Sequence, residues 1–395
     1  MITNQSGIIV ILTRKIKYMQ FKDVIGQSTV KQRLIASVQK NHVPHAQLFL
    51  GPAGCGKLPL ALAYAQYILC PNRTETDSCG VCPTCQKVQK LVHPDLHFVV
   101  PTNTTKSVKS NPESDLFMEE WREFALKNDG YFNDTDWYAF LDIENKQGYM
   151  SVRDAASLLR KLSMKAYEGE YKIAIIWMAE KMRVETANKL LKLLEEPPEK
   201  TVFLLIAEDQ DQLLATIKSR TALVKIPAID TASIEMALQQ RYGCDPKQAH
   251  DAAMISEGNW LTACQSFKDF EDHKFFFATF QQWMRLCFRG AYPEIIDFSA
   301  NIKTIGREKQ KELLEYGLRI IRNSLLFNNN LANIVMLPED EKGFNSKFAP
   351  FVNPANLAQI AELFEEAIRQ IERNGNAQII ITDVSFKMVG LLKKK

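Results

Sequence analysis

The stretch Ala46-Gln47-Leu48-Phe49-Leu50-Gly51-Pro52-Ala53-Gly54-Cys55-Gly56-Lys57-Leu58 decides the fold class. Its first five residues, mostly apolar, predict a strand, and the residues after Lys57 open a helix. Between them stands the pattern Gly, four residues, Gly-Lys, in which the glycines let backbone N–H groups turn towards phosphate oxygens. Lys57 would add charge for the β and γ phosphates. We therefore predict a phosphate-binding loop with these candidate nucleotide contacts: Gly51, Gly54, Gly56 and Lys57.

Four more apolar runs alternate with helical patterns further along the chain. The runs are 96–100, 173–177, 202–207 and 223–226. Continuous rather than alternating apolarity is typical of strands that are covered on both faces. A helical pattern over 187–194 stops before Pro197, as a helix must before proline. Strands that alternate with helices predict a three-layer α/β domain with a parallel sheet.

Residues 102–150 interrupt this pattern with a polar segment that also carries six aromatic side chains. These are Trp121, Phe124, Tyr131, Phe132, Trp137 and Tyr138. We interpret the segment as a surface insertion that its aromatic residues order in part. A plain loop is the simpler alternative, and a partner-docking role is another.

Strand patterns end after Pro227, and helical patterns take over to the end of the chain. Short helices are expected over 229–270, and apolar stripes at helical spacing continue through 271–395. We therefore expect an α/β domain at 19–228, a small helical domain at 229–270 and a helical domain at 271–395. Residues 1–18 form an N-terminal extension to which we assign no function.

Composition excludes several classes of protein. The 395 residues carry 49 basic and 46 acidic side chains, a net charge of +3, so the chain has no bulk electrostatic attraction to nucleic acid. No run of 18 apolar residues occurs, and the N-terminal apolar run is too short for a signal peptide. Four of the eight cysteines crowd into 70–85, which is unlike a secreted disulfide framework. We expect a cytoplasmic protein without a membrane segment.

The parts of the loop that would act on ATP are missing. The position after Lys57 normally carries a hydroxyl that holds Mg²⁺, and here it is Leu58. The third strand should end in two acidic residues, but Trp177 and Met178 stand there. Glu180 comes two residues late, and we expect it to point elsewhere. We therefore predict little or no ATP hydrolysis and, at most, weak binding of ATP or ADP.

The cysteine cluster has the spacing of a metal site. Its members are separated by 8, 2 and 2 residues: Cys70, Cys79, Cys82 and Cys85. Cys-x2-Cys turns bring two thiolates onto one ion, and four sulfurs satisfy tetrahedral Zn²⁺. Free or disulfide-bonded cysteines are the alternative. We predict a closed, structural zinc site, with DNA binding through the nearby Lys87 and Lys90 as a second possibility.

Taken together, these motifs resemble the clamp-loader subunits of bacterial DNA polymerase III, which belong to the AAA+ class, and within them the delta-prime group. The resemblance covers residues 19–270 and, in pattern only, the last 120 residues. The four cysteines carry it together with four segments: FKDVIGQ (21–27), HAQLFLGPAGCGK (45–57), ANKLLKLLEEPP (187–198) and IKSR (217–220).

The resemblance implies a P-loop AAA+ parallel-sheet domain with a zinc knuckle, a helical lid domain and a helical collar domain. It implies that the adenine side of a nucleotide pocket is lined by Val24, Ile25, Gly26 and Gln27. The four cysteines would hold the zinc. Arg220 would reach the ATP site of a neighbouring subunit, whereas an isolated arginine here would suggest only a surface salt bridge. The family has Ser-Arg-Cys at this point, and Thr221 departs from its last position.

Several residues differ from those of the family's ATP-hydrolysing motor subunits, and these differences indicate a stator, a subunit that does not hydrolyse ATP itself. Leu58, Trp177 and Met178 are three losses, and Leu261 replaces a lid arginine. We expect a non-hydrolysing subunit that assembles with gamma/tau motor subunits and delta, and that meets the sliding clamp and primed DNA through the complex. The alternatives are an active gamma/tau-like ATPase and a zinc-dependent nucleic-acid-binding module with a vestigial P-loop.

Overall fold

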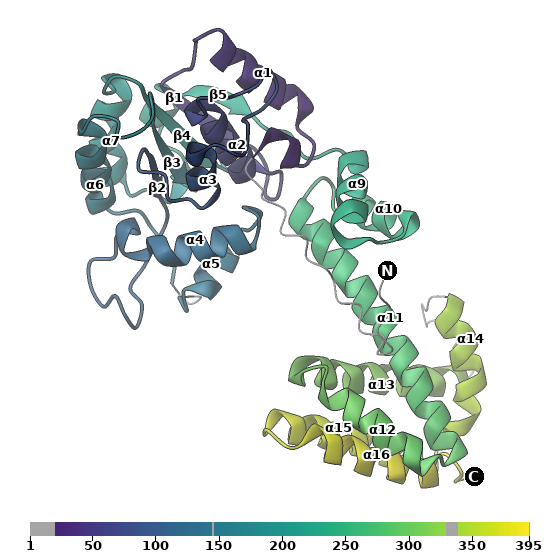
Figure 1. Ribbon diagram of the computed structural model, residues 1–395. Coiled ribbons are helices and arrows are strands. Elements are labelled where there is room, and N and C mark those ends of the chain that lie inside the picture. Colours follow the sequence, from purple (N-terminus) through teal and green to yellow (C-terminus); the bar gives the residue numbers. More distant parts are fainter. Residues whose placement is uncertain (1–19, 144–145, 329–338, 395) are drawn as a thin grey trace. The chain divides into compact units, whose positions relative to one another are not determined.

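The computed structural model describes residues 20–143, 146–328 and 339–394 (Figure 1). The N-terminal extension predicted at 1–18 lies outside the described residues. The chain divides into two compact units, one ending at Phe267 and the other beginning at Lys268. The boundary falls inside helix α11, Trp260–Arg289.

The first unit is built on a parallel sheet with the strand order β2-β3-β4-β1-β5. The strands are β1 (Ala46–Leu50), β2 (Leu96–Val99), β3 (Lys172–Trp177), β4 (Thr201–Ala207) and β5 (Ala222–Lys225). Each predicted apolar run is confirmed to within one residue. Every residue of β3 and β4 is buried, as continuous apolarity predicts for central strands.

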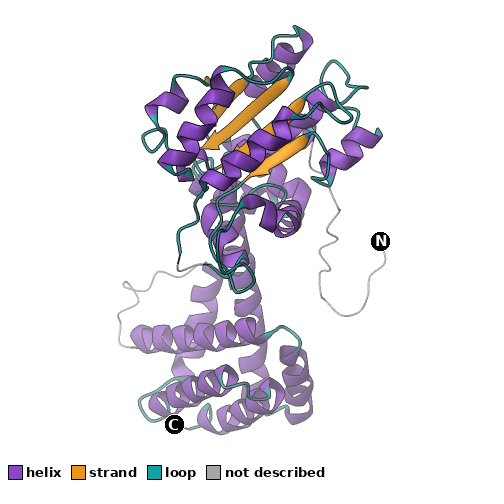
Figure 2. Ribbon diagram, turned by 90° about the vertical axis from the view of Figure 1, so that its left-hand side faces the viewer, coloured by secondary structure: helices purple, strands orange, loops and turns teal. Residues whose placement is uncertain are grey.

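Helices cover both faces of this sheet (Figure 2). Alternate residues of β3 face opposite sides of the sheet. Ile175 lies in a core with residues of α1 (Ser28–Gln39) and α2 (Lys57–Leu69), and Ile176 lies in a core with residues of α6 (Val152–Ser163) and α7 (Val184–Glu195). The helices of the sheet region are α1 (Ser28–Gln39), α2 (Lys57–Leu69), α3 (Pro83–Gln89), α4 (Met118–Lys127), α5 (Asp134–Phe140), α6 (Val152–Ser163), α7 (Val184–Glu195) and α8 (Ala215–Lys218). The predicted three-layer α/β arrangement is confirmed.

The segment 102–150 is not the plain loop that was the simpler alternative, and its aromatic side chains order it more fully than the interpretation as a surface insertion expected. It forms α4 and α5, and Trp121 and Trp137 are fully buried in the same core as β3. Trp121 lies against Trp137 with ring centroids 5.4 Å apart and against Trp177 at 5.2 Å. The aromatic side chains therefore extend the core beyond the sheet, while the polar residues face solvent.

The chain after β5 is helical throughout its described residues. Helices α9 (Thr231–Tyr242) and α10 (Pro246–Ile255) pack with the start of α11 in the first unit. The second unit contains the rest of α11, α12 (Tyr292–Lys303), α13 (Arg307–Asn328), α14 (Glu339–Phe348), α15 (Leu357–Glu372) and α16 (Ala377–Leu391). One of the apolar stripes expected within 271–395 lies on α11, where Phe276, Phe280, Trp283 and Cys287 are buried. The indole N–H of Trp283 donates to Ser385 Oγ at 2.7 Å. Short 3-10 turns lie at Phe21–Asp23, Ser114–Phe117, Ala179–Lys181 and Ala349–Phe351.

None of the helices that the structure describes combines the length and the apolarity needed to cross a bilayer.

Candidate functional site

The predicted phosphate loop lies where β1 ends and α2 begins. Gly54 and Gly56 both have a positive φ, at +68° and +86°. Residues other than glycine rarely adopt this backbone conformation. Gly56 is the residue before the first turn of α2, so the backbone N–H groups of the helix start face the loop. The loop therefore has the backbone form that its sequence predicts.

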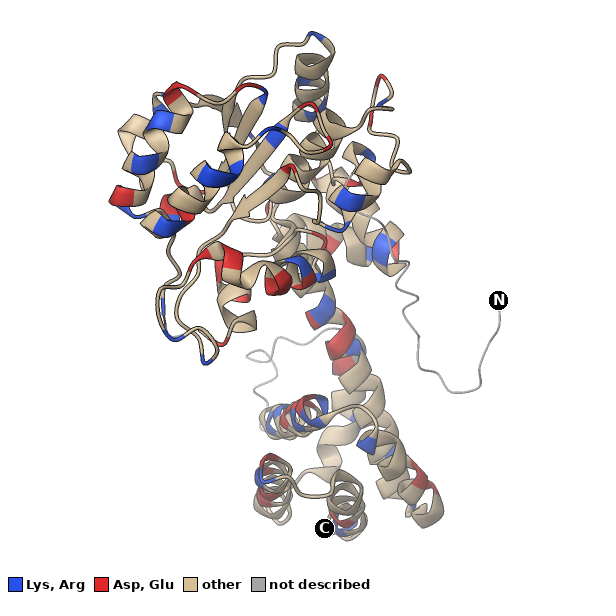
Figure 3. Ribbon diagram, turned by 60° about the vertical axis from the view of Figure 1, so that its left-hand side comes forward, with Lys and Arg blue, Asp and Glu red and all other residues tan. Residues whose placement is uncertain are grey.

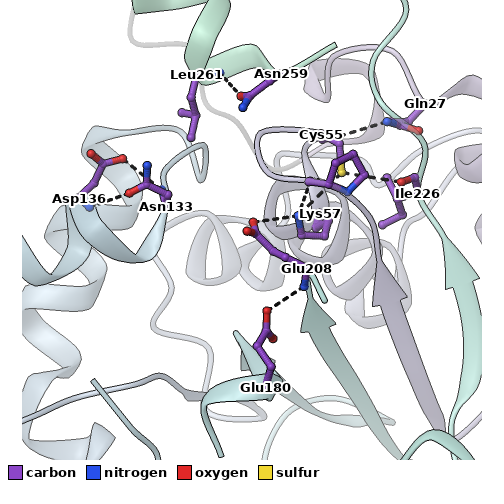
Figure 4. Close-up of polar contacts among 11 residues, drawn as sticks. Gln27, Cys55, Lys57, Asn133, Asp136, Glu180, Glu208, Ile226, Asn259 and Leu261 are labelled. Atoms are coloured by element: carbon purple, nitrogen blue, oxygen red, sulfur yellow. Dashed lines mark hydrogen bonds and ion pairs between the residues drawn. The ribbon is translucent and has the colours of Figure 1, made fainter. Parts of the chain in front are cut away.

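Lys57 is turned inward and has partners within its own chain (Figure 4). Its Nζ lies 2.6 Å from the carbonyl oxygen of Pro52 and 3.1 Å from Oε1 of Glu208, and the side chain is only 6% exposed. Glu208 directly follows β4, the neighbour of β1 in the sheet. The cation of the loop is thus paired with a carboxylate of the adjacent strand end.

Glu180 does not point elsewhere, and that expectation is wrong. Its Oε1 accepts the backbone N–H of Glu208 at 2.9 Å, so it supports the partner of Lys57 (Figure 4). Burial raises the pKa of Glu180. Trp177 and Met178, in contrast, are buried in the core, where they offer no oxygen to a metal ion or a water molecule.

Leu58 also lies in the core, at 3% exposure, so the position that would supply a Mg²⁺ ligand is apolar and covered.

The segment Val24–Gln27 lies beside the phosphate loop. The Gln27 side-chain amide donates to the carbonyl oxygens of Cys55 at 3.1 Å and Pro227 at 2.7 Å. The backbone N–H of Ile25 donates to the hydroxyl of Tyr131 at 3.0 Å. The structure therefore brings together the loop and the segment that the resemblance assigns to a nucleotide, and it adds Tyr131 between them.

The cysteine cluster has the geometry of a metal centre. The Sγ atoms of all four cysteines lie within 4.8 Å of one another. Cys70 Sγ lies 3.6 Å from Cys79 Sγ and 4.0 Å from Cys82 Sγ, and Cys79 Sγ lies 3.8 Å from Cys85 Sγ. Four sulfurs at ~2.3 Å from one ion in a tetrahedron would be ~3.8 Å apart. The cluster can hold a metal ion.

Backbone groups around the cluster are arranged for thiolates. The N–H groups of Cys79, Cys82 and Cys85 each lie 3.4 Å from the sulfur of the preceding member of the cluster. Such donors stabilise negative sulfur. Lys87, one of the two cations considered for DNA binding, forms an ion pair with Glu168.

Arg220 lies at the opposite end of the sheet from the phosphate loop. It follows α8 and precedes β5, whose first residue Ala222 is in register with Gln47 near the start of β1. Its guanidinium binds Glu195 at 2.5 and 2.6 Å and the carbonyl oxygen of Thr216 at 3.1 Å. The side chain is one-third exposed.

Three residues of this site were not identified from the sequence: Tyr131, Glu208 and Asn259. The Asn259 side chain lies over Gly54, and the N–H of Trp260 donates to the Gly54 carbonyl at 3.2 Å. Glu208 could have been found, because it follows a predicted strand at the same sheet edge as the loop. Tyr131 lies in the segment interpreted as surface, and no local signal connects it to the loop.

Comparison with known proteins identifies sequence relatives. The sequence model of the family described as "DNA polymerase III, delta subunit" matches residues 26–230, about half of the chain. DNA polymerase III subunit delta' of Pseudomonas aeruginosa is 30% identical over 220 residues, 55% of this chain and 54% of the relative. Subunit tau of Escherichia coli is 25% identical over 254 residues, 63% of this chain and 32% of the relative. The chain thus spans about half of the delta' relative and a third of tau.

Two solved structures illustrate a distant likeness. A gamma subunit-related protein of DNA polymerase III from Thermotoga maritima aligns at a TM-score of 0.34 and 14% identity, over 92% of this chain and 99% of that one. The RuvB Holliday junction branch migration motor of the same organism aligns at a TM-score of 0.38 and 14% identity, over 65% of each chain. Conclusions about family rest on the sequence matches.

Proposed function

The chain belongs to the DNA polymerase III delta subunit family, and from this premise we propose that it is a non-hydrolysing stator of the clamp loader. In this role it completes the ATP site of a neighbouring motor subunit, within the complex that loads the sliding clamp onto primed DNA. The delta' and tau relatives support the clamp-loader assignment, and the resemblance to the delta-prime group is confirmed.

The position of Arg220 carries the stator proposal. Ala222 is in register with Gln47, whereas the phosphate loop begins after Leu50, three residues further along the strand, and then turns away from the sheet. At ~3.3 Å per residue, the strand alone separates Arg220 from its own loop by ~10 Å or more. A partly exposed arginine at this edge is therefore available to another chain rather than to its own site.

The rest of the site supports a subunit without its own ATPase activity. Phosphoryl transfer depends on a metal ion and on charges that surround the transferred group. Leu58, Trp177 and Met178 provide neither. Lys57 is neutralised by Glu208.

We assign a structural Zn²⁺ to the site that is formed by Cys70, Cys79, Cys82 and Cys85. Four sulfurs leave no open position for substrate, so the ion would tie the end of α2 to α3 and supply no catalysis. We also assign 229–270 as the lid and 271–395 as the collar through which the chain assembles with gamma/tau and delta.

Reconstitution with a gamma/tau subunit of the same organism tests the stator proposal. The chain alone should hydrolyse no ATP, and it should raise the ATPase rate of the motor subunit in the assembled complex. Arg220→Ala should abolish this rise, since a trans arginine contributes ~10³–10⁵ to the rate in other nucleotide hydrolases. Glu195→Ala, which releases Arg220 from its present partner, should keep the rise.

Lys200→Ala is the matched control, because Lys200 forms an exposed ion pair with Glu170 at 2.6 Å in the same unit. It should leave the stimulation unchanged. Normal stimulation by Arg220→Ala, in a complex that still assembles, would show that the arginine role is wrong.

An active motor is the second candidate, because tau and gamma/tau proteins are also among the relatives. Multiple turnover of ATP by the pure chain, lost in Lys57→Ala, would establish it in place of the stator.

A further inference from the structure

We propose that a groove in the second unit binds an acidic amphipathic helix of another protein. The groove lies between α11 (Trp260–Arg289) and the segment formed by α14 (Glu339–Phe348) with the 3-10 turn Ala349–Phe351. It holds a cavity of about 820 Å³, within the ~300–1,000 Å³ of ligand sites. The inference goes beyond the stator proposal, because neither ATP nor Arg220 enters it.

The two walls of the groove run side by side in the same direction (Figure 1). Phe280 of α11 lies against Phe344 of α14, with ring centroids 6.3 Å apart. Further along both walls, Phe288 lies against Phe351 at 4.8 Å. The part of α11 that lines the groove extends over residues 281–289, which span ~12 Å at ~1.5 Å per residue. The groove is therefore long enough for about two turns of a bound helix.

The lining of the groove is largely apolar. It includes Met284, Leu286, Phe344, Phe348 and Leu392. Phe288 adds a ring that is 48% exposed. A nucleic acid needs a row of cations along its phosphates, whereas an amphipathic helix lays apolar anchors at i, i+3 or i+4 and i+7 into such a groove. The apolar lining favours the helix.

Gly343 leaves one wall of the groove open. It lies in the interior of α14, where glycine lowers helix stability relative to alanine. A Cβ at Gly343 would meet no atom within 4 Å, so the packing of the fold does not require glycine there. In contrast, a Cβ at Gly317 would lie 2.5 Å from the ring of Phe364, so that glycine is required by packing. A helix that approaches α14 closely gives a reason for glycine at position 343.

The rim of the groove is positively charged. Arg285 and Lys347 are exposed there, and neither has a carboxylate partner in the part of the chain that the structure describes. Glu294 is the single acidic residue among the described residues of the lining, and it pairs with Arg289 at 2.7 Å. The rim therefore complements acidic side chains that flank the apolar anchors of a bound helix.

The test is fluorescence anisotropy of the full-length chain with labelled synthetic peptides of about 16 residues, long enough to form a helix. The acidic peptide carries Leu at i, i+3 and i+7 and Glu beside them. A basic peptide has Lys in place of each Glu, and a scrambled peptide keeps the acidic composition in another order. The wild-type chain should bind the acidic peptide with a Kd below ~100 µM, at least ~tenfold more tightly than the other two.

Filling the groove should remove this binding. Gly343→Leu places a side chain in the open space and should weaken the affinity for the acidic peptide at least ~tenfold. Gly390→Leu is the matched control, because Gly390 also lies in a helix, α16, where a Cβ would meet no atom within 4 Å. Gly390 lines a different cavity, so this variant should bind as the wild-type chain does.

Reversing the charge of the rim should reverse the preference. The double variant Arg285→Glu with Lys347→Glu should bind the basic peptide more tightly than the acidic one. Arg322→Glu changes an exposed cation of α13 outside the lining, and it should keep the wild-type preference. Circular dichroism shows that each variant is folded.

Four results would overturn the inference. The first is a folded wild-type chain that does not bind the acidic peptide, and the second is equal affinity for the acidic and basic peptides. The third is binding of single-stranded DNA that Gly343→Leu abolishes, which would assign the groove to nucleic acid. The fourth is a dimer in sedimentation that Gly343→Leu dissociates, which would assign it to a second copy of the chain. No motor subunit or ATP is present in these experiments, so their failure leaves the Arg220 test of the stator intact.

Discussion

Asp129 is partly buried two residues before Tyr131, and its ionisation should affect stability. Burial raises the pKa of its carboxyl group to about 6, although Arg241 opposes the shift. The unfolded chain ionises near the ordinary value of 3.8, so stability is lost as the pH rises from about 4 to about 6. Asp129→Asn mimics the protonated form, and asparagine tolerates the positive φ of 54° at this position.

We therefore expect Asp129→Asn to be more stable than the wild-type chain by ~1–2 kcal/mol above pH 6.5, after a discount for partial exposure, and to match it below pH 4. Urea unfolding across this pH range measures the difference. Asp142→Asn is the control, because Asp142 has a similar φ of 56° and is exposed. A gain that is independent of pH would mean that the burial of charge is not the cause.

At the scale of elements, the cysteine cluster connects the end of α2 to the start of α3. The thiolates repel one another without an ion, and three of the four cysteines are buried. A strong chelator should remove one zinc per chain, lower the melting temperature and speed hydrogen exchange over 70–90. Metal analysis of Cys82→Ser should show less than one equivalent, while Cys244→Ser should keep the full content. Retention of one equivalent by Cys82→Ser would contradict a four-cysteine site.

Helix α4 should contribute to stability as a core element. Trp121 is fully buried between Phe98, Phe132, Trp137 and Trp177. Trp121→Ala should cost ~3–5 kcal/mol in the free energy of unfolding, since it removes a large side chain from a packed core. Leu126→Ala, on the same helix but 40% exposed, should cost under ~1 kcal/mol. Equal small losses for both would mean that α4 is a surface appendage.

The elements also show where prediction from sequence works and where it stops. Strands β1 to β4 were predictable because burial on both faces requires continuous apolar runs. The edge strand β5 has the same kind of apolar run, although three of its four residues are exposed. The absence of a Mg²⁺-binding hydroxyl and of two acidic residues at Leu58, Trp177 and Met178 could also be predicted. These positions are located by adjacent sequence motifs, namely the Gly-Lys pair of the loop and the apolar run of the third strand. Glu208 reaches Lys57 only through the fold, across 151 residues, and Tyr131 likewise reaches the loop at Gly56. The polar composition of 102–150 concealed the packing of its aromatic side chains.

At the scale of the whole molecule, the balance of charge bears on how the protein meets DNA. The net charge is +3 from 49 basic and 46 acidic residues, and helices of both units carry both signs in Figure 3. Some of the described cations are paired with carboxylates, as Lys87 is with Glu168 and Arg289 is with Glu294. Because the two signs are interspersed on the helices, we expect the chain alone to neutralise few phosphates.

We expect the isolated chain to bind primed DNA weakly and with a shallow dependence on salt. A protein that neutralises Z phosphates shows a log–log salt slope of about −0.9Z, so a slope weaker than about −3 is the expected result for this chain. If the chain works within a clamp loader as proposed, the assembled complex should bind more tightly and with a steeper slope, since further subunits can add phosphate contacts. Fluorescence anisotropy at several salt concentrations compares the two.

The same measurement separates the stator from a nucleic-acid-binding module. A module that reads DNA through the cysteine cluster would bind with a steep slope as an isolated chain, and Cys82→Ser would abolish that binding while the α/β sheet stays folded. The proposed stator needs no such surface, because in that role Arg220 and residues 271–395 would contact other proteins. Tight binding by the isolated chain, lost with the metal, would therefore contradict the stator and favour the module.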